Sequence, residues 1–442
     1  MLNSIFNHKN LKLSFIATSV ALIGAVNAAD YYQVIDLGPV DSSRSEAFSI
    51  NDFNQVVGSA NGTDFLNRAF VYNDGQSDFL SYLPYTFETG GISYEGHSFA
   101  FDINNNDIAV GVSGEIVTDA EDNDINVDTA VIFDIANSTI VRIPQFLPDE
   151  PHDAKALAIN DNGLVVGFGN FDPPEDVDDD GNDIVRLLNR GFFYDSNSQV
   201  LTMINPNITE QTLPNVTLRD VNDSGYAVGV QGEIFSNGSF LSKVVGVDIQ
   251  SPDTVELIEI FAGNRELAWS INNQNVMVGA ANSDTDGGVV QAFSYDIVSE
   301  TITELGFLND NFKYSEAYDI NESNQVVGIS QFQNSPIVYH AFLYDSGVMR
   351  NLNDLIGCDT GWTLNEARSI NDYDSGFNSG LITGNGLKDG EKRAFMLMPI
   401  AGTAPDCSAD DTDDSSGGGS TSLFGLGIVF SMLLFRRRRQ VR

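Results

Sequence analysis

A short motif recurs seven times along the chain and constrains the fold more than any other feature. Six copies share an apolar residue, an asparagine, a polar turn and a Val-Gly-like ending, and a seventh copy carries an insertion of six residues before its glycine. Repeats spaced by 49 to 62 residues indicate a solenoid or a propeller, because each repeat is one supersecondary unit that stacks on its neighbours. The repeat asparagines are Asn51, Asn104, Asn160, Asn222, Asn272, Asn321 and Asn371.

Each motif predicts a β-hairpin. Alternating residues precede the asparagine, a cluster of Asn, Asp, Gly and Ser follows it as a tight turn, and the Val-Val-Gly ending starts the return strand. A third strand follows, as in RAFVY, QAFSY and HAFLY, and a weaker fourth strand is present in some units, such as residues 301–306. Outside the two ends of the chain we find no convincing helical period.

Four antiparallel strands per unit predict one blade of a β-propeller, so the fold class is all-β, a seven-bladed β-propeller over residues 29–400. Residues 31–38 resemble a fourth strand that lacks the three before it, whereas the last unit ends without a fourth strand. We therefore expect the N-terminal strand to pair with residues 393–398 of the last blade and close the ring, which removes two sheet edges. An open β-solenoid is the alternative.

The first 28 residues have the pattern of a secretory signal peptide. Lys9 and Lys12 precede an apolar run that ends in Val-Asn-Ala at residues 26–28, a small-residue cleavage site. We expect cleavage after Ala28 and export of the protein. An uncleaved anchor helix is the alternative, although the apolar run is short for a membrane span.

The C-terminal end carries a second targeting pattern. An acidic, glycine-rich spacer at residues 401–419 precedes residues 420–442, which contain a short apolar segment and a run of arginines. This arrangement resembles the GlyGly-type C-terminal sorting signal of marine Gammaproteobacteria. The resemblance implies transient insertion of the tail into the membrane, removal by a rhomboid-type sorting protease near residues 417–419, and display at the cell surface or release. A retained tail anchor is the alternative.

The charge of the chain excludes several classes of partner. Removal of both ends takes away seven of the 22 basic residues and none of the 62 acidic residues, so the net charge of the exported part is about −47. A chain with this charge is repelled by nucleic acid and by anionic lipid, and we expect neither as a partner.

The repeats themselves resemble a known group, the HAF extracellular repeat family. Residues 340–342 read His-Ala-Phe, and LNDLIGCDTGWTLNEARSINDYD together with RAFMLMP resembles the terminal unit of that family. The resemblance covers residues 31–399 and implies a secreted or surface-displayed bacterial protein without an established activity. One departure is the fourth unit, where Val244 and Val245 replace Ala-Phe.

The sequence offers few residues for catalysis. The exported part has three histidines in different units and none at ligand spacing with another His or Cys, so a zinc site is not expected. Nucleophile-elbow, phosphate-binding and dinucleotide-binding motifs are absent from the sequence. We therefore expect a non-catalytic binding module for a glycan or a protein, with a propeller-type polysaccharide hydrolase or lyase as the alternative. A structural envelope component without a small ligand is a third option.

One pair of repeat positions is a candidate ligand-binding site. A glutamate lies five residues before the asparagine in the same three units that carry a basic residue before Ala-Phe. We expect each glutamate and its basic partner to meet across a small residue of the second strand and to form a polar face on three neighbouring blades. The candidate residues are Glu46, Glu316, Glu366, Arg68, His340 and Arg393. Cross-strand ion pairs that only stabilise the sheets are the alternative.

Two cysteines are present in the whole chain, Cys358 and Cys407. Both lie in the exported part, where the compartment is oxidising, so a disulfide between them is expected. Two free thiols are the alternative.

Two acidic inserts are candidate calcium loops. In DVDDDGND, the residues Asp176, Asp178 and Asp180 precede a glycine, as in the first half of an EF-hand-type loop, but Leu187 stands where such a loop supplies a bidentate glutamate. A looser version at Asp122 and Asp124 lies in the equivalent loop of the second unit. We expect weak calcium binding, with two solvated acidic loops as the alternative.

Overall fold

The computed structural model describes residues 31–39, 42–62, 66–83, 86–89, 92–118, 124–144, 152–171, 188–204, 215–234, 240–261, 263–283, 288–372 and 380–400. The predicted signal peptide, spacer and sorting signal lie outside these residues, as do Cys407, Asp122 and the insert with Asp176, Asp178 and Asp180. Within the described ranges no helix is long and apolar enough to cross a membrane.

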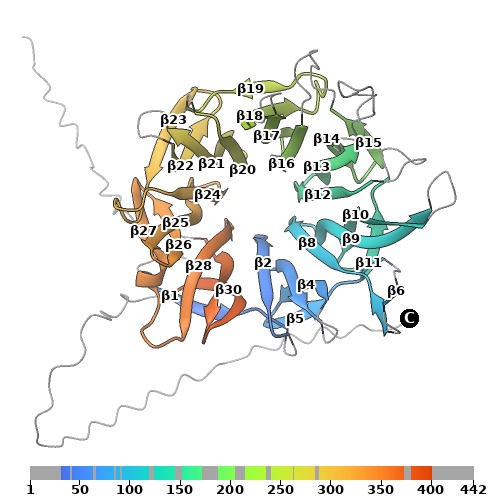
Figure 1. Cartoon of the computed structure of the whole chain (residues 1–442), viewed down its shortest axis with the longest axis horizontal. Helices are drawn as coiled ribbons and strands as arrows, with labels where there is room; N and C mark the ends of the chain where they lie inside the picture. The colour runs from blue at the N-terminus through green and yellow to red at the C-terminus, as the bar shows by residue number, and fades with distance from the viewer. Residues whose placement is uncertain are drawn as a thin grey trace, which may run out of the picture. The chain divides into compact units, whose positions relative to one another are not determined.

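Seven antiparallel four-stranded sheets are arranged in a ring (Figure 1). The innermost strands of all seven sheets line a central channel. The first four blades are β2 (Ser45–Ile50), β3 (Val56–Asn61), β4 (Asn67–Asn73) and β5 (Gln76–Phe79); β8 (Ser98–Ile103), β9 (Ile108–Thr118), β10 (Asp124–Asp134) and β11 (Thr139–Arg142); β12 (Ala154–Ile159), β13 (Leu164–Phe171), β14 (Leu188–Asp195) and β15 (Val200–Met203); and β16 (Asn215–Val221), β17 (Tyr226–Ile234), β18 (Phe240–Asp248) and β19 (Glu256–Ile258).

The remaining blades are β20 (Glu266–Ile271), β21 (Val276–Ser283), β22 (Val289–Asp296) and β23 (Thr301–Gly306); β24 (Ser315–Ile320), β25 (Val326–Asn334), β26 (Ile337–Asp345) and β27 (Val348–Asn351); and β28 (Trp362–Ile370), β29 (Ile382–Lys388), β30 (Glu391–Pro399) and β1 (Tyr32–Asp36). A short 3-10 helix, η2 (Leu352–Leu355), leads into the last blade. A hairpin of β6 (Thr86–Thr89) and β7 (Ile92–Glu95), which the repeat pattern did not predict, lies between the first two blades in the chain.

The predicted all-β, seven-bladed propeller is therefore confirmed. In the last blade β1 pairs antiparallel with β30, with Tyr32 opposite Pro399 and Asp36 opposite Phe395. The outermost strand of this blade thus comes from the start of the chain and the three inner strands come from its end (Figure 1).

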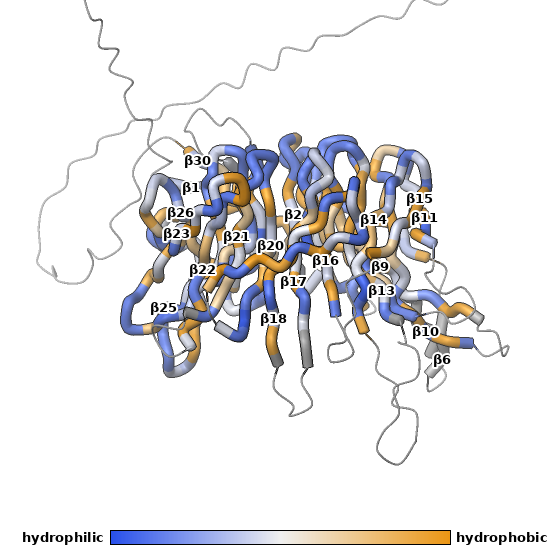
Figure 2. Tube along the Cα trace, turned by 90° about the horizontal axis from the view of Figure 1, so that it is seen from above, coloured by the Kyte–Doolittle hydropathy of each residue, from blue (hydrophilic) through white to orange (hydrophobic). Residues whose placement is uncertain are grey.

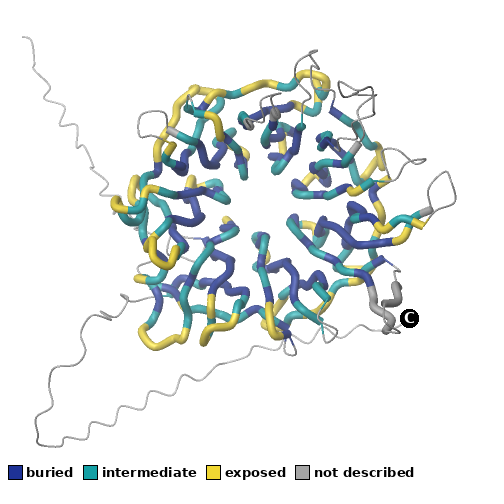
Figure 3. Tube along the Cα trace, viewed as in Figure 1, coloured by how far each residue is buried: buried dark blue, intermediate teal, exposed yellow. Residues whose placement is uncertain are grey.

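The core lies between neighbouring blades. Each hydrophobic cluster combines side chains from two adjacent sheets, and the aromatic ring of the Ala-Phe strand is fully buried in five blades. Apolar residues gather in the middle of the strands and hydrophilic residues at the turns (Figure 2), while most exposed positions are on the outer strands (Figure 3). The five buried rings are Phe70, Phe192, Phe293, Phe342 and Phe395.

Every innermost strand carries a β-bulge three residues before the repeat asparagine. The pairing register shifts there by one residue, as between Ala47 and Ser49 in β2, and the extra residue is turned toward the channel. The recurring glycine stands opposite, because a Cβ on it would lie only 1.9 to 2.1 Å from a carbonyl oxygen of the bulged strand. The bulged residues are Phe48, Phe101, Leu157, Arg219, Trp269, Tyr318 and Arg368.

Candidate ligand-binding channel

The repeat asparagines form a closed ring of hydrogen bonds at one end of the channel. The Nδ2 group of each asparagine donates to the backbone carbonyl oxygen of the equivalent asparagine in the next blade, at 2.8 to 3.3 Å. Asn371 donates to Asn51 and completes the circle at 2.8 Å. The Oδ1 atom of the asparagine also accepts hydrogen bonds from backbone N–H groups of its own turn, as Asn272 does from Gln274 and Val276. One side chain therefore stabilises both its own hairpin and the interface with the next blade.

The residues that directly follow the repeat asparagines form a second ring of hydrogen bonds. The backbone N–H of each residue donates to a side-chain oxygen of its counterpart in the next blade, at 2.8 to 3.1 Å, and Asp372 closes the circle onto Asp52. Burial and the neighbouring Asp52 and Glu322 raise the pKa of Asp372 to about 6. The members of this acidic ring are Asp52, Asn105, Asp161, Asp223, Asn273, Glu322 and Asp372.

Three aspartates in alternate blades line the channel wall next to the asparagine ring. Asp102, Asp220 and Asp319 each accept a backbone N–H from the following blade at 2.8 Å, and Ser49 and Ser270 donate to Asp102 and Asp319. Burial raises the pKa of all three carboxyls to about 6. These hydrogen bonds connect neighbouring blades and fix the three carboxyl groups in the channel wall.

These aspartates predict a pH dependence of stability. Their pKa is higher in the folded chain than in the unfolded chain, so their contribution to stability is greatest below about pH 4 and is lost as the pH rises through 6. Replacing Asp102, Asp220 and Asp319 by Asn should remove this slope, worth about 1 kcal/mol per carboxyl after allowance for solvent in the channel. Melting temperatures of the chain and its variant at pH 4.5 and pH 7.5 test this, and equal slopes would contradict it.

The bulged residues line a cavity of about 450 Å³ in the channel. In the first three blades they are apolar, namely Phe48, Phe101 and Leu157, whereas in the other four two arginines flank two aromatic rings. The cavity therefore has an apolar wall and a cationic, aromatic wall.

The cationic wall is a continuous stack of four side chains, which we call the Arg–aromatic stack: Arg219, Trp269, Tyr318 and Arg368. The Cζ atom of Arg219 lies 4.0 Å from the centroid of the Trp269 ring, Trp269 meets Tyr318 edge to face at 5.3 Å, and Arg368 lies 4.6 Å from the Tyr318 centroid. Burial lowers the pKa of Arg219 to about 10, with Glu316 opposing the shift. Arg219 remains charged at neutral pH in a partly desolvated site.

The predicted pairing of glutamates with basic residues is wrong. Lys392 binds Glu46 at 2.6 Å, and Arg368 binds Glu366 at 3.0 Å. Arg265 binds Glu316 at 3.1 Å, and the Tyr314 hydroxyl also donates to this glutamate.

The predicted basic partners make other contacts. Arg68 lies 4.8 Å from the centroid of Tyr82, and His340 stacks on Phe332 and contacts Asn351. Arg393 binds Asp36 at 3.0 Å. The bulges explain the difference for Arg68 and His340, because they place Glu46 opposite Ser59 and Glu316 opposite Ile329, one position away from the row of the basic residue. The six residues are not brought together as three pairs, and their role in ligand binding stays a prediction.

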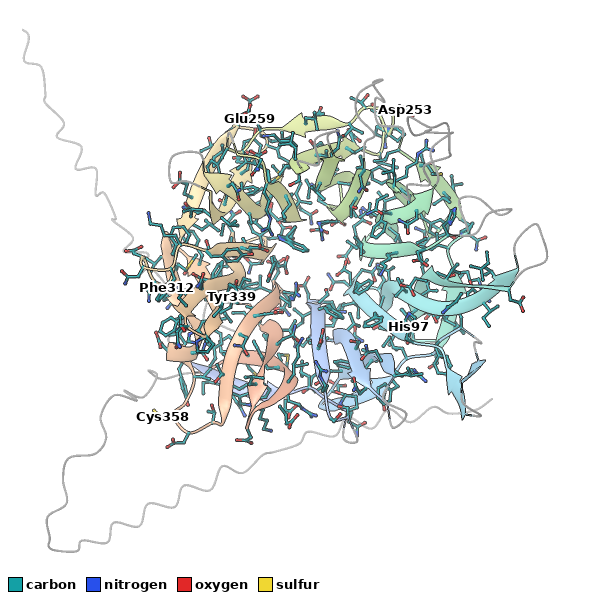
Figure 4. All side chains as sticks on the ribbon, in the orientation of Figure 1. His97, Asp253, Glu259, Phe312, Tyr339 and Cys358 are labelled. Atoms are coloured by element: carbon teal, nitrogen blue, oxygen red, sulfur yellow. The ribbon has the colours of Figure 1, made fainter. Side chains whose placement is uncertain are left out.

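The calcium prediction rests mainly on residues outside the described ranges. Asp124 begins β10, and Asp128 of the same acidic segment is bound by His97 at 2.7 Å and by Lys155 at 3.3 Å. His97 lies on the second blade (Figure 4). In the part of the chain that the structure describes, no group of three or more His, Cys, Asp or Glu side chains is placed to hold a metal.

The disulfide prediction also stays open, because Cys407 is not among the described residues. Cys358 lies on the segment that leads into β28, at the outer side of the last blade (Figure 4). A bond from this position would tie the C-terminal segment to the closing blade.

The Arg–aromatic stack was not identified from the sequence, although a signal was present. Its members lie three residues before the repeat asparagine, a position whose residue type varies from unit to unit while its neighbours recur. Variation at one fixed position inside a repeat marks side chains that are free of the repeat's packing.

Comparison with known proteins adds a family and leaves the activity open. The model of a family described as protein of unknown function (DUF3466) matches residues 149–311 and 268–389. No curated protein matches the chain. Among the solved structures that match is the extracellular domain of a proposed one component system from B. thetaiotaomicron, with a TM-score of 0.42 and 12% identity, over 83% of this chain and 40% of that one. This chain thus spans less than half of that structure's length.

Proposed function

The chain belongs to the family described as protein of unknown function (DUF3466), and we propose that it is an exported, non-catalytic module that binds a glycan in the channel of its propeller. The Arg–aromatic stack carries this proposal. Two aromatic rings and two guanidinium groups face a cavity of about 450 Å³, a size within the range of small-ligand sites.

The shape of the cavity favours a glycan over a protein. Aromatic rings bind the apolar faces of sugar rings, and a cavity of about 450 Å³ admits the end of a chain or a few sugar units, whereas a protein ligand needs a broad surface. The walls are also rigid, because hydrogen-bonded rings of side chains hold the neighbouring blades. A preformed site loses little entropy on binding.

Trp269 is the residue to test first. Replacing Trp269 by Ala should weaken binding of any saccharide that the full chain captures on a glycan array by at least tenfold, because the stack loses one of its two rings. Calorimetry with the captured saccharide measures the effect.

The matched control removes an aromatic ring outside the channel. Phe53 is 66% exposed in the turn after β2, so Phe53→Ala should leave the affinity unchanged. An equal loss of affinity in both variants, or none in Trp269→Ala, would refute binding in this cavity.

A polysaccharide hydrolase or lyase is the second candidate, and one contact favours it. The Tyr314 hydroxyl donates to Glu316, which Arg265 also binds, and a tyrosine beside a carboxylate is the nucleophile pair of some glycosidases. Burial and Glu316 raise the pKa of Tyr314, so Glu316 would have to take its proton during attack. Turnover of the captured saccharide that is lost in Tyr314→Phe would replace the binding proposal with this one.

The targeting segments complete the proposal. Cleavage after Ala28 and removal of the tail near residues 417–419 would leave the propeller at the cell surface or outside the cell. There a disulfide between Cys358 and Cys407 and weak calcium binding by the acidic loops would be available to stabilise it.

A further inference from the structure

We infer that the ligand of the channel is an acidic saccharide, whose carboxylate or sulfate group is bound by the guanidinium groups of Arg219 and Arg368. The inference rests on the proposed function and names the ligand class of the same cavity.

The geometry of the two arginines is the first argument. Each guanidinium lies over an aromatic ring, so one of its faces is covered and its N–H groups donate in its own plane, where Nε of Arg368 already donates to Glu366. A row of N–H donors in one plane matches the paired oxygens of a carboxylate or the oxygens of a sulfate. The two arginines lie at the two ends of the Arg–aromatic stack, with the two rings between them.

Two donors without acceptors are the second argument. Nε of Arg219 and Nε1 of Trp269 are buried and have no hydrogen-bond partner among the described residues. Arg219 and Trp269 are in contact, so both donors belong to the same end of the stack. A buried donor without an acceptor keeps the full cost of its desolvation, and an acid group with two or three oxygens would satisfy both donors at once.

Neighbouring carboxylates determine which of the two arginines contributes more to binding of an acidic ligand. Glu366 binds Arg368 at 3.0 Å and neutralises part of its charge. Glu316 is held by Arg265 and Tyr314, and Asp220 accepts a backbone N–H of the next blade. Arg219 therefore has the less compensated charge and should be the stronger anchor.

The opposite wall completes the fit. Phe48, Phe101 and Leu157 present apolar surface to the same cavity. A sugar ring has an apolar face of C–H groups and a polar edge, and an acid group on that edge would reach the arginines while the ring lies toward the apolar wall.

The test compares acidic and neutral oligosaccharides on the full chain. Calorimetry with oligogalacturonate, with a sulfated galacto-oligosaccharide and with a neutral galacto-oligosaccharide of equal length separates carboxylate, sulfate and neutral ligands. We expect tight binding of one or both acidic oligomers, a loss of about 10- to 100-fold in Arg219→Gln, and a smaller loss in Arg368→Gln. Arg219→Lys, which keeps the charge and loses the planar fork, should recover part of the affinity.

Arg44→Gln is the control, because it removes the same charge from an exposed residue immediately before β2 and outside the stack. It should bind like the unchanged chain, and melting curves confirm that each variant is folded. Equal binding of neutral and acidic oligomers, or unchanged affinity in both Arg219→Gln and Arg368→Gln, would overturn the inference and leave the proposed function standing. Binding of no saccharide of either kind would overturn the proposed function itself.

Discussion

Replacing Gly328 by Ala is expected to destabilise the protein by about 3 kcal/mol, because its Cβ would lie 2.0 Å from the carbonyl oxygen of Glu316. The ring of Phe342 and the Cα of Ala317 lie within 3.0 Å of the same point. Relief of this clash would require the bulge of β24 to open. That movement would displace Tyr318 from its position in the channel. Urea denaturation of the full chain measures the loss.

Gly347→Ala is the comparison that separates a steric clash from an unfavourable backbone conformation as causes of lost stability. Gly347 lies in the turn between β26 and β27 with a φ of +84°, and nothing lies within 4 Å of a Cβ placed on it. Its substitution should therefore cost only about 1 to 2 kcal/mol, the price of a left-handed conformation. If Gly328→Ala is no less stable than Gly347→Ala, the bulge does not need the glycine.

Replacing Asn272 by Ala is expected to cost about 2 to 4 kcal/mol, since four hydrogen bonds are lost in a buried position. Oδ1 of Asn272 accepts from the backbone N–H groups of Gln274 and Val276, and Nδ2 donates to the carbonyl oxygen of Asn321 and to Asn324. The substitution opens the asparagine ring between the fifth and sixth blades. Thermal and urea unfolding measure the effect.

Asn272→Asp gives the same prediction a pH signature. At pH 7 a carboxylate would face the Asn321 carbonyl oxygen, so the folded state should raise its pKa, and stability should return as the pH falls toward 4 and the carboxyl donates again. Asn137, whose side chain binds Asp134 in an exposed turn, is the control, and Asn137→Ala should cost less than 1 kcal/mol. Equal losses of stability in Asn137→Ala and Asn272→Ala would show that the asparagine ring does not contribute to the stability of the fold.

The number of blades, their hairpins and the strand that completes the last blade could be predicted from the sequence. These features depend on local patterns: alternating residues predict a strand, the polar cluster predicts its turn, and a fixed period repeats both. Residues 31–38 could be assigned as a strand because they match the fourth strand of a unit, and the structure places β1 beside β30.

The contacts of the site were decided by the tertiary structure. A bulge adds one residue to each inner strand, and the spacing of the repeats does not reveal it. The bulge shifts Glu46 and Glu316 by one position, so that they no longer lie in line with Arg68 and His340 across the sheet. The same bulge turns Arg219, Trp269, Tyr318 and Arg368 into the channel. These four residues lie about 50 positions apart in the sequence, and only closure of the ring brings them into one stack. Local sequence patterns determine strands and turns, whereas contacts between blades depend on where the whole ring places each side chain.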